Sequence, residues 1–140
     1  MLFPTHLSAD DREAIRDVLA RYVHALDNRR FAEVAALFSL DGEWRSKHGN
    51  AVSPAVIEAR LRATTVARDA GGPAQPRRHF NTNFSIQAGP DGTAEVVSTF
   101  VTVQQTEHGL APVTLGSYHD TLIRQGGTWL FRQRIIEHHA

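Results

Sequence analysis

The chain contains no cysteine, and its 15 lysine and arginine side chains balance 15 aspartate and glutamate side chains. A fold without cysteine does not depend on disulfide bonds. Without a cationic excess the chain lacks the attraction to phosphate backbones that nucleic-acid binding usually needs, so we expect no nucleic-acid partner. Its longest apolar stretches, such as residues 34–38, fall far short of the about 20 residues that span a bilayer. Residues 1–4 also lack the charged and apolar regions of a signal peptide, so we expect a cytoplasmic protein without a membrane partner.

Several common catalytic motifs are also missing. There is no cysteine nucleophile, no G-x-S-x-G turn and no glycine-rich phosphate-binding loop. The eight histidines do not follow the spacings that place two metal ligands on one element, and residues 138–139 are most simply interpreted as a solvated tail. The sequence therefore predicts no metal site.

The N-terminal half has the pattern of helices. Ser8 and Asp11 form a predicted N-cap pair, and His24 falls on the solvent side of the helix that follows. The apolar residues of this helix recur at helical spacing: Ile15, Val18, Leu19, Tyr22, Val23 and Leu26. A second, shorter helix is predicted by Phe31, Val34, Ala35 and Phe38 and is closed by residues 41–42, and a third is predicted from Ser53-Pro54 to about Arg68.

The C-terminal half has the pattern of strands. Four long strands are predicted at residues 77–87, 93–104, 113–125 and 128–137, and a short one at residues 43–46. Residues 69–76, with two glycines and two prolines, are interpreted either as a lid or as a plain connection. Helices followed by an antiparallel meander predict one α+β domain over residues 1–140.

Asp27 and His79 are the residues that suggest chemistry. Asp27 lies in the last turn of the first predicted helix, where the helix dipole disfavours negative charge by about 0.3–1 kcal/mol. It either caps the helix, pairs with Arg29 or Arg30, or serves another purpose. If the fold brings the two side chains together, the carboxylate can hold one imidazole nitrogen as N–H and leave the other free to accept a proton.

Strand alternation alone does not place His79 in a pocket. Period-two alternation puts Phe80, Thr82, Phe84 and Ile86 on one face of residues 77–87 and His79, Asn81, Asn83 and Ser85 on the other. A sheet with one wet face would expose the histidine. A sheet covered on both faces would instead point it into a polar pocket.

Five short motifs, in order along nearly the whole chain, resemble the SnoaL-like branch of the NTF2-like superfamily. They are Tyr22-x4-Asp27, Phe38-x2-Asp41-Gly42-x-Trp44, Arg78-His79-x3-Asn83, Gly116-x-Tyr118-x-Asp120 and Gly127-x-Trp129-x-Phe131-x2-Arg134. The resemblance implies a cone-shaped α+β barrel, in which a curved antiparallel sheet wraps three helices around a deep apolar pocket.

The resemblance also implies residue roles. Members such as scytalone dehydratase, bile-acid dehydratases and hexachlorocyclohexane dehydrochlorinase use an Asp–His pair to remove a proton, and Asp27 and His79 match it. Tyr22 matches a catalytic phenol and Arg134 a cation that stabilises the leaving group. The residues expected to form the substrate pocket are Val23, Leu26, Trp44, Leu61, Gly116, Tyr118 and Asp120. A further acid of the bile-acid enzymes has no counterpart in residues 98–102.

The sequence thus favours a lyase of the dehydratase type, or an isomerase, that needs no cofactor. Its expected partner is a small apolar molecule, whether steroid-like, polyketide or aromatic. The competing hypothesis is a non-catalytic binder or a structural subunit similar to the β subunit of ring-hydroxylating dioxygenases. A homo-oligomer, either a trimer or a dimer, is expected to form through the outer sheet face, where Phe80, Phe84 and Ile86 would suit a contact.

Overall fold

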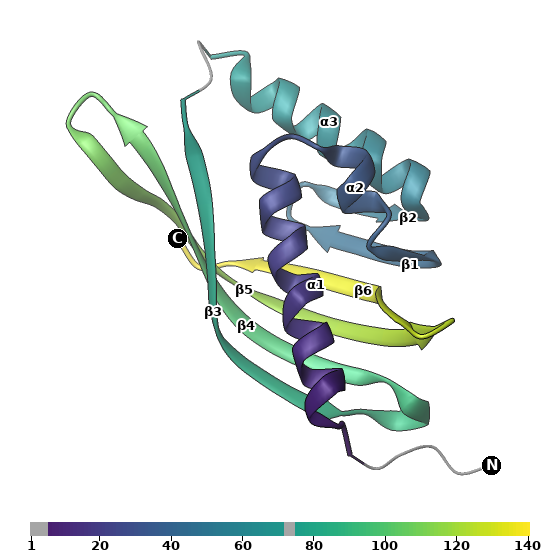
Figure 1. The fold of residues 1–140 in the computed structure, drawn as a ribbon. Coiled ribbons are helices and arrows are strands. Elements are labelled where there is room, and N and C mark those ends of the chain that lie inside the picture. Colours follow the sequence, from purple (N-terminus) through teal and green to yellow (C-terminus); the bar gives the residue numbers. More distant parts are fainter. Residues whose placement is uncertain (1–5, 72–74) are drawn as a thin grey trace.

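The computed structural model describes residues 6–71 and 75–140. Within these residues the chain forms three α-helices and a six-stranded, strongly curved sheet (Figure 1). The predicted α+β class is confirmed. The elements, in order, are α1 (Ala9–Asp27), α2 (Phe31–Ala35), β1 (Phe38–Ser46), β2 (Gly49–Val52), α3 (Pro54–Asp69), β3 (Arg77–Ala88), the 3-10 turn η1 (Pro90–Gly92), β4 (Ala94–Thr106), β5 (Gly109–Gln125) and β6 (Thr128–His138).

The strands lie in the order β2-β1-β6-β5-β4-β3. The predicted meander of four long antiparallel strands is confirmed in β3 to β6. The prediction of one additional short strand was incomplete, because β1 pairs in parallel with β6 and β2 pairs with β1. β3 is consequently an edge strand, and its outer backbone groups are available to other partners.

The second helix is shorter than predicted. It ends at Ala35, and Phe38 begins β1 instead of completing the helix. The reason is tertiary pairing, since Phe38 lies beside Phe131 of β6 and the Phe131 N–H donates to the Leu37 carbonyl at 2.8 Å. A buried phenylalanine fits an apolar helix face and a central strand equally well, so its spacing could not distinguish them.

Both ends of α1 are fixed. At its start the Ser8 hydroxyl accepts from the Asp11 N–H, and the Asp11 carboxylate accepts from the Ser8 N–H, so the predicted capping box is confirmed. At its end Arg29 adopts a left-handed φ of 58°, and the Arg30 N–H donates back to the Ala25 carbonyl at 2.8 Å. This is the hydrogen-bonding pattern of a Schellman cap. Asp27 is therefore the last residue of a helix whose end is well defined.

An irregularity in β3 decides which side chains face inward. Asn83 has a left-handed φ of 56°, and the register with β4 shifts between Thr82 and Ser85. Before the shift His79 points toward the helices and Phe80 is exposed; after it, Ile86 is buried. The predicted alternation was therefore wrong about Ile86, because a bulge inverts the faces of a strand. Phe80 lies on the outer face as predicted, whereas Phe84, which follows the bulge, is 36% exposed at the sheet edge.

The helices cover the inner face of the sheet. α1 lies along the concave side, next to β3, while α3 packs on β1 and β2 (Figure 1). The core between these layers includes Ile15, Leu19, Val34, Ile57, Val96, Leu122, Trp129 and Phe131. None of the helices in the described part of the chain combines the length and apolar character needed to cross a membrane.

A buried ion pair lies within this core. Arg134 of β6 and Asp120 of β5 are both almost fully buried and form two hydrogen bonds, at 2.7 and 2.8 Å. The guanidinium carbon also lies 3.7–4.5 Å from the ring centroids of Tyr118, Tyr22 and Phe131. Burial alone would lower the pKa of Arg134, but the charge and hydrogen bonds of Asp120 outweigh it and hold that pKa above its ordinary value. The arginine therefore stays charged.

Removing one partner of this pair is expected to destabilise the protein strongly. In Asp120→Ala the Arg134 guanidinium is left buried without its counterion, which typically costs about 3–5 kcal/mol of unfolding free energy. Replacing both partners by apolar residues, Asp120→Leu with Arg134→Met, should recover most of that loss. Urea unfolding of the single and double variants measures both effects, and a loss in Asp120→Ala no greater than that of a surface substitution would contradict this account.

Candidate active site

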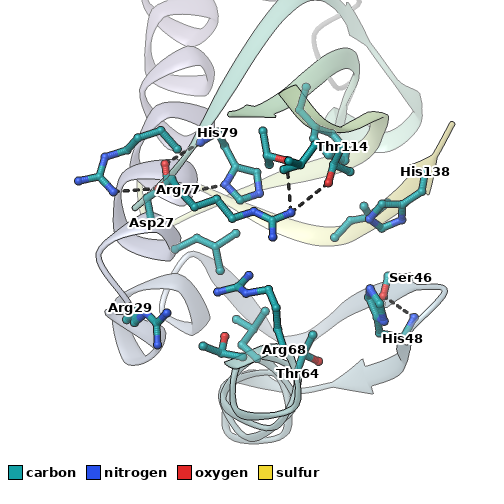
Figure 2. Close-up of a pocket in the computed structure, with 18 of the residues that line it drawn as sticks. Asp27, Arg29, Ser46, His48, Thr64, Arg68, Arg77, His79, Thr114 and His138 are labelled. Atoms are coloured by element: carbon teal, nitrogen blue, oxygen red, sulfur yellow. Dashed lines mark hydrogen bonds and ion pairs between the residues drawn. The ribbon is translucent and has the colours of Figure 1, made fainter. Parts of the chain in front are cut away.

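A cavity of about 970 Å³ opens between α1, α3 and the inner face of the sheet. The elements that surround it come from both halves of the chain, so helices and sheet together define its shape (Figure 2). Its walls include Tyr22, Leu26, Asp27, Trp44, His48, Arg60, Leu61, Thr65, Arg68, Arg77, His79, Phe100, Thr102, Thr114, Tyr118, Ile136 and His138. A volume of this size falls within the range of small-molecule sites.

The side chains of Asp27 and His79 meet in the wall of this cavity. The His79 Nδ1 lies 2.6 Å from Asp27 Oδ1, and the His79 backbone N–H donates to Asp27 Oδ2 at 2.8 Å. That backbone N–H is available because β3 is an edge strand. One carboxylate thus binds both the backbone and the ring of a single residue, and this fixes the orientation of the imidazole.

The pairing leaves the second imidazole nitrogen to the cavity. When the ring is neutral, a proton on Nδ1 is held by the Asp27 carboxylate, and Nε2 is then the unprotonated nitrogen. The His79 Nε2 has no hydrogen-bond partner among the described residues. The His79 side chain is 14% exposed and that of Asp27 is 6% exposed, so the base is accessible while its carboxylate is shielded. This arrangement can accept a proton from a bound molecule.

Two tyrosines form the floor of the cavity. The Tyr22 hydroxyl accepts a hydrogen bond from the Trp44 indole N–H at 3.0 Å. The Tyr118 hydroxyl makes no hydrogen bond to another described residue. Burial raises the pKa of Tyr22 and raises that of Tyr118 well above its ordinary value, so both phenols are protonated at neutral pH. Tyr118 is therefore the phenol better placed to donate to a bound molecule.

Gly116 supports this floor without contributing to it directly. It pairs with Phe100 across β4 and β5, and a Cβ at Gly116 would collide with the Phe100 ring. The missing side chain lets Phe100 stack on Tyr118, with ring centroids 4.5 Å apart. The sequence identified Gly116 as a pocket residue, and the structure shows it beneath the wall.

The structure brings together some of the sequence-predicted residues but not all. Those that line the cavity are Asp27, His79, Tyr22, Leu26, Trp44, Leu61 and Tyr118. Those that do not are Val23, Gly116, Asp120 and Arg134. Val23 packs in the core, and Asp120 binds Arg134 behind the cavity floor. Arg134 was expected to meet a leaving group, but its guanidinium is enclosed by aromatic rings behind the floor.

The rim of the cavity is more basic than the predicted apolar pocket. Its described residues include six lysines and arginines, namely Arg29, Lys47, Arg60, Arg68, Arg77 and Arg78. His138 also lines the cavity, so the interpretation of this residue as a solvated tail was wrong: β6 extends through it and pairs it with Gly116. The sequence offered one sign of this basic rim: Arg77 lies two residues before His79 and therefore shares its strand face.

Parts of the prediction fall outside this description. The stretch at residues 69–76 that was considered as a lid contains residues 72–74, which lie outside the described residues. On either side of them, Arg68, Gln75 and Pro76 line the cavity. Among the described residues, no group of three or more histidine, aspartate or glutamate side chains is arranged to hold a metal ion.

Comparison with known proteins agrees with this architecture. A model of the SnoaL-like domain matches residues 8–135. The chain belongs to the SnoaL-like family. The resemblance predicted from the five motifs is thereby confirmed, whereas the roles of individual residues stay predictions.

Solved structures of similar proteins cover nearly the whole SnoaL-like domain. ActVI-ORFA from Streptomyces coelicolor is 26% identical, with a TM-score of 0.81 over 91% of this chain and 94% of the other. Aln2 from a Streptomyces species is 25% identical, with a TM-score of 0.80 over 98% and 94%. A protein from Catenulispora acidiphila, solved in complex with S-DNPA, is 25% identical, with a TM-score of 0.80 over 94% and 95%. A search of curated proteins finds no match.

The Asp27 contact should fix the tautomer of His79 in this SnoaL-like domain. In the neutral ring we expect the proton on Nδ1, because only that nitrogen faces the carboxylate. Asp27→Ala removes the acceptor and should abolish this preference. The ¹⁵N chemical shifts of the ring nitrogens measure it, and His24, which is exposed on α1, serves as the internal reference. A wild-type ring protonated on Nε2 alone would contradict the assignment.

Proposed function

We propose that this protein is a cofactor-independent enzyme that removes a proton from a carbon atom of a small molecule and thereby catalyses an elimination of the dehydratase type or an isomerisation. The observation that carries the proposal is the Asp27–His79 pair in the wall of a 970 Å³ cavity. A histidine oriented by a carboxylate and open to a cavity is the arrangement expected of a general base.

The chemistry follows from the placement of the base and the phenols. His79 Nε2 takes the proton from a carbon next to a carbonyl group, and the electrons of the broken C–H bond move onto the carbonyl oxygen as an enolate. Asp27 stabilises the imidazolium that forms. In the elimination branch, the enolate then expels a hydroxyl group from the neighbouring carbon, which leaves as water after receiving a proton. In the isomerase branch the proton returns to a different carbon.

General base catalysis contributes only about 10²–10⁴-fold, so the developing negative charge also needs a donor. Tyr118 supplies the free phenol at the cavity floor, and we assign it this role. Tyr22, whose hydroxyl already accepts from Trp44, is assigned to the same floor as a second donor. Arg134 acts in this proposal as a positioning residue, because its guanidinium lies against both tyrosine rings.

A small-molecule ligand also agrees with the comparisons, since the C. acidiphila relative is a complex with S-DNPA. That complex belongs to the relative and does not identify the molecule bound here. Because many chemistries use one fold, the proposal depends on the site and not on the family.

The base is tested with a simple activated ketone. Deuterium exchange at the acidic carbon of 2-tetralone in D₂O, followed by NMR, should be faster with the wild-type protein than without it. His79→Ala should lower the protein-dependent rate by about 10²–10⁴-fold, because no other described residue faces that position with a paired imidazole. His24→Ala changes an exposed histidine and should have no effect.

The thermal midpoint of His79→Ala separates lost chemistry from lost folding. A folded His79→Ala variant that retains the exchange rate would remove His79 from the mechanism. Saturable binding of the ketone to the wild-type protein without any acceleration would favour a binder over an enzyme.

We also propose that the outer sheet face joins copies of this chain. Several large apolar side chains are exposed there or at its edge: Phe80 (59% exposed), Val97 (45%), Leu115 (40%) and Phe84 (36%). Contiguous apolar surface of this kind marks interfaces.

A charge on this face should therefore dissociate the oligomer. Phe80→Glu is expected to give a monomer by light scattering at a protein concentration where the wild type is a dimer or trimer. Val66→Glu, a matched change of an exposed apolar residue on α3, should leave the mass unchanged. A monomeric wild-type protein would refute this proposal.

A further inference from the structure

The cavity has an unbalanced charge. Six lysine and arginine side chains line it among the described residues, whereas Asp27 is the single carboxylate side chain that does so. The chain as a whole is neutral, so this imbalance is local. Asp27 already accepts two hydrogen bonds from His79 and cannot serve as the counterion of them all.

Some of these cations are neutralised outside the cavity. Arg29 lies 2.5 Å from Asp69, and Arg68 lies 3.7 Å from the same carboxylate. Arg77 differs from them, because it forms no ion pair within 4.0 Å with any described residue. Burial lowers the pKa of Arg77 and the positive charge of Arg68 lowers it further, while the charge of Asp27 raises it and offsets this in part. Arg77 is thus a half-buried cation without a counterion in direct contact among the described residues.

Hydrogen bonds hold the Arg77 guanidinium in the wall. Its Nη2 donates to the hydroxyls of Thr114 at 3.0 Å and Thr102 at 3.3 Å. Its Nε is buried from solvent and has no partner among the described residues. An orphaned buried donor normally costs free energy, so such a group calls for a partner, which can be a water, an ion or a ligand. The side chain extends from the Asp27–His79 pair toward Thr114 and His138 (Figure 2).

His138 adds a second unsatisfied polar atom to the same wall. Its Nδ1 is buried without a partner among the described residues, and its ring packs edge-on against Phe100 and His48. Arg60 also reaches this region, since its guanidinium lies beside Gly49, next to His48 in the chain. Two cations, Arg77 from β3 and Arg60 from α3, therefore line the cavity together with the His138 imidazole from β6.

From this arrangement we propose that the molecule bound in the cavity carries a carboxylate, which Arg77 binds through its unpaired N–H groups, with His138 facing the same anion. The inference rests on the proposed function only in that the ligand occupies the same cavity as the base. Arg77 and His79 lie two residues apart on one face of β3, which separates their Cα atoms by roughly 6–7 Å. The anion would therefore anchor one end of the ligand while its acidic carbon faces His79.

A carboxylate fits this wall better than a phosphate group. Phosphates are commonly bound by backbone N–H groups at a helix N-terminus. None of the described residues that line the cavity belongs to the first turn of a helix. The planar fork of an arginine binds either anion, so the lack of helix N-terminal groups among the described lining residues is what favours a carboxylate.

Two probes of nearly equal shape test the charge directly. 2-Naphthylacetate and its neutral amide, 2-naphthylacetamide, are titrated into the wild-type protein by calorimetry at neutral pH. The acid should bind about 10- to 100-fold more tightly, as expected of hydrogen bonds to a charged group. Equal affinities, or no saturable binding of the acid at millimolar concentration, would overturn the proposal. 2-Naphthyl phosphate distinguishes the anion class, and tighter binding of the phosphate than of the acid would overturn the assignment to a carboxylate.

Variants locate the anion. Arg77→Gln should remove most of the preference for the acid and leave the affinity of the amide unchanged, while Arg77→Lys, which keeps the charge but not the fork, should retain part of it. Arg68→Gln is the matched control, because Arg68 lines the same cavity but has Asp69 beside it. If Arg68→Gln weakens acid binding as much as Arg77→Gln, the site is not at Arg77.

A second readout is the titration of His138. Burial first, and then the positive charges of Lys47, His48, Arg77 and His139, lower the pKa of His138. A bound carboxylate beside it should raise that pKa, so binding near neutral pH should be accompanied by proton uptake at this ring. NMR titration should show the rise with 2-naphthylacetate and not with the amide, and an unchanged pKa would exclude His138 from the site.

These measurements are of binding alone, so they are independent of the exchange assay. A preference for the acid without any proton exchange would leave the carboxylate site standing and refute the enzyme. Exchange that depends on His79, without a preference for the acid, would support the enzyme and refute the carboxylate site.

Discussion

The site depends on one contact, in which the Asp27 carboxylate binds both the backbone N–H and the ring Nδ1 of His79. This contact joins the end of the first helix to the edge strand, two elements that are 52 residues apart in the chain. The carboxylate lies where the helix dipole disfavours it, and the two N–H groups of His79 compensate for that position. The Asp27 side chain thus both accepts a hydrogen bond from the exposed strand edge and orients the imidazole.

Behind this contact the floor of the cavity is rigid because it is stacked. The Arg134 guanidinium packs against the rings of Tyr22 and Tyr118. Because Gly116 has no side chain, the Phe100 ring can stack on Tyr118. The buried ion pair with Asp120 keeps the arginine in place. The tyrosines that line the cavity are therefore held in place by Arg134, Asp120 and Gly116, which do not line it.

The sequence predicted the framework well and the inner surface poorly. The capping box of Ser8 and the spacing of the long strands are local signals, and both were sufficient. The bulge at Asn83 was not recognisable, because asparagine adopts the left-handed conformation only occasionally and the pairing with β4 sets it here. The partners of Arg134 and the placement of His138 depend on contacts between strands, and no spacing within one element could reveal them.

The two caps of α1 have an implication for how the site tolerates change. Because Ser8 fixes one end and Arg29 the other, the number of residues between them sets the direction in which Asp27 points. One residue inserted into or removed from the helix would turn the carboxylate by about 100° around the axis and displace it by about 1.5 Å. Variation in this protein should consequently accumulate as substitutions along α1 and not as changes in its length.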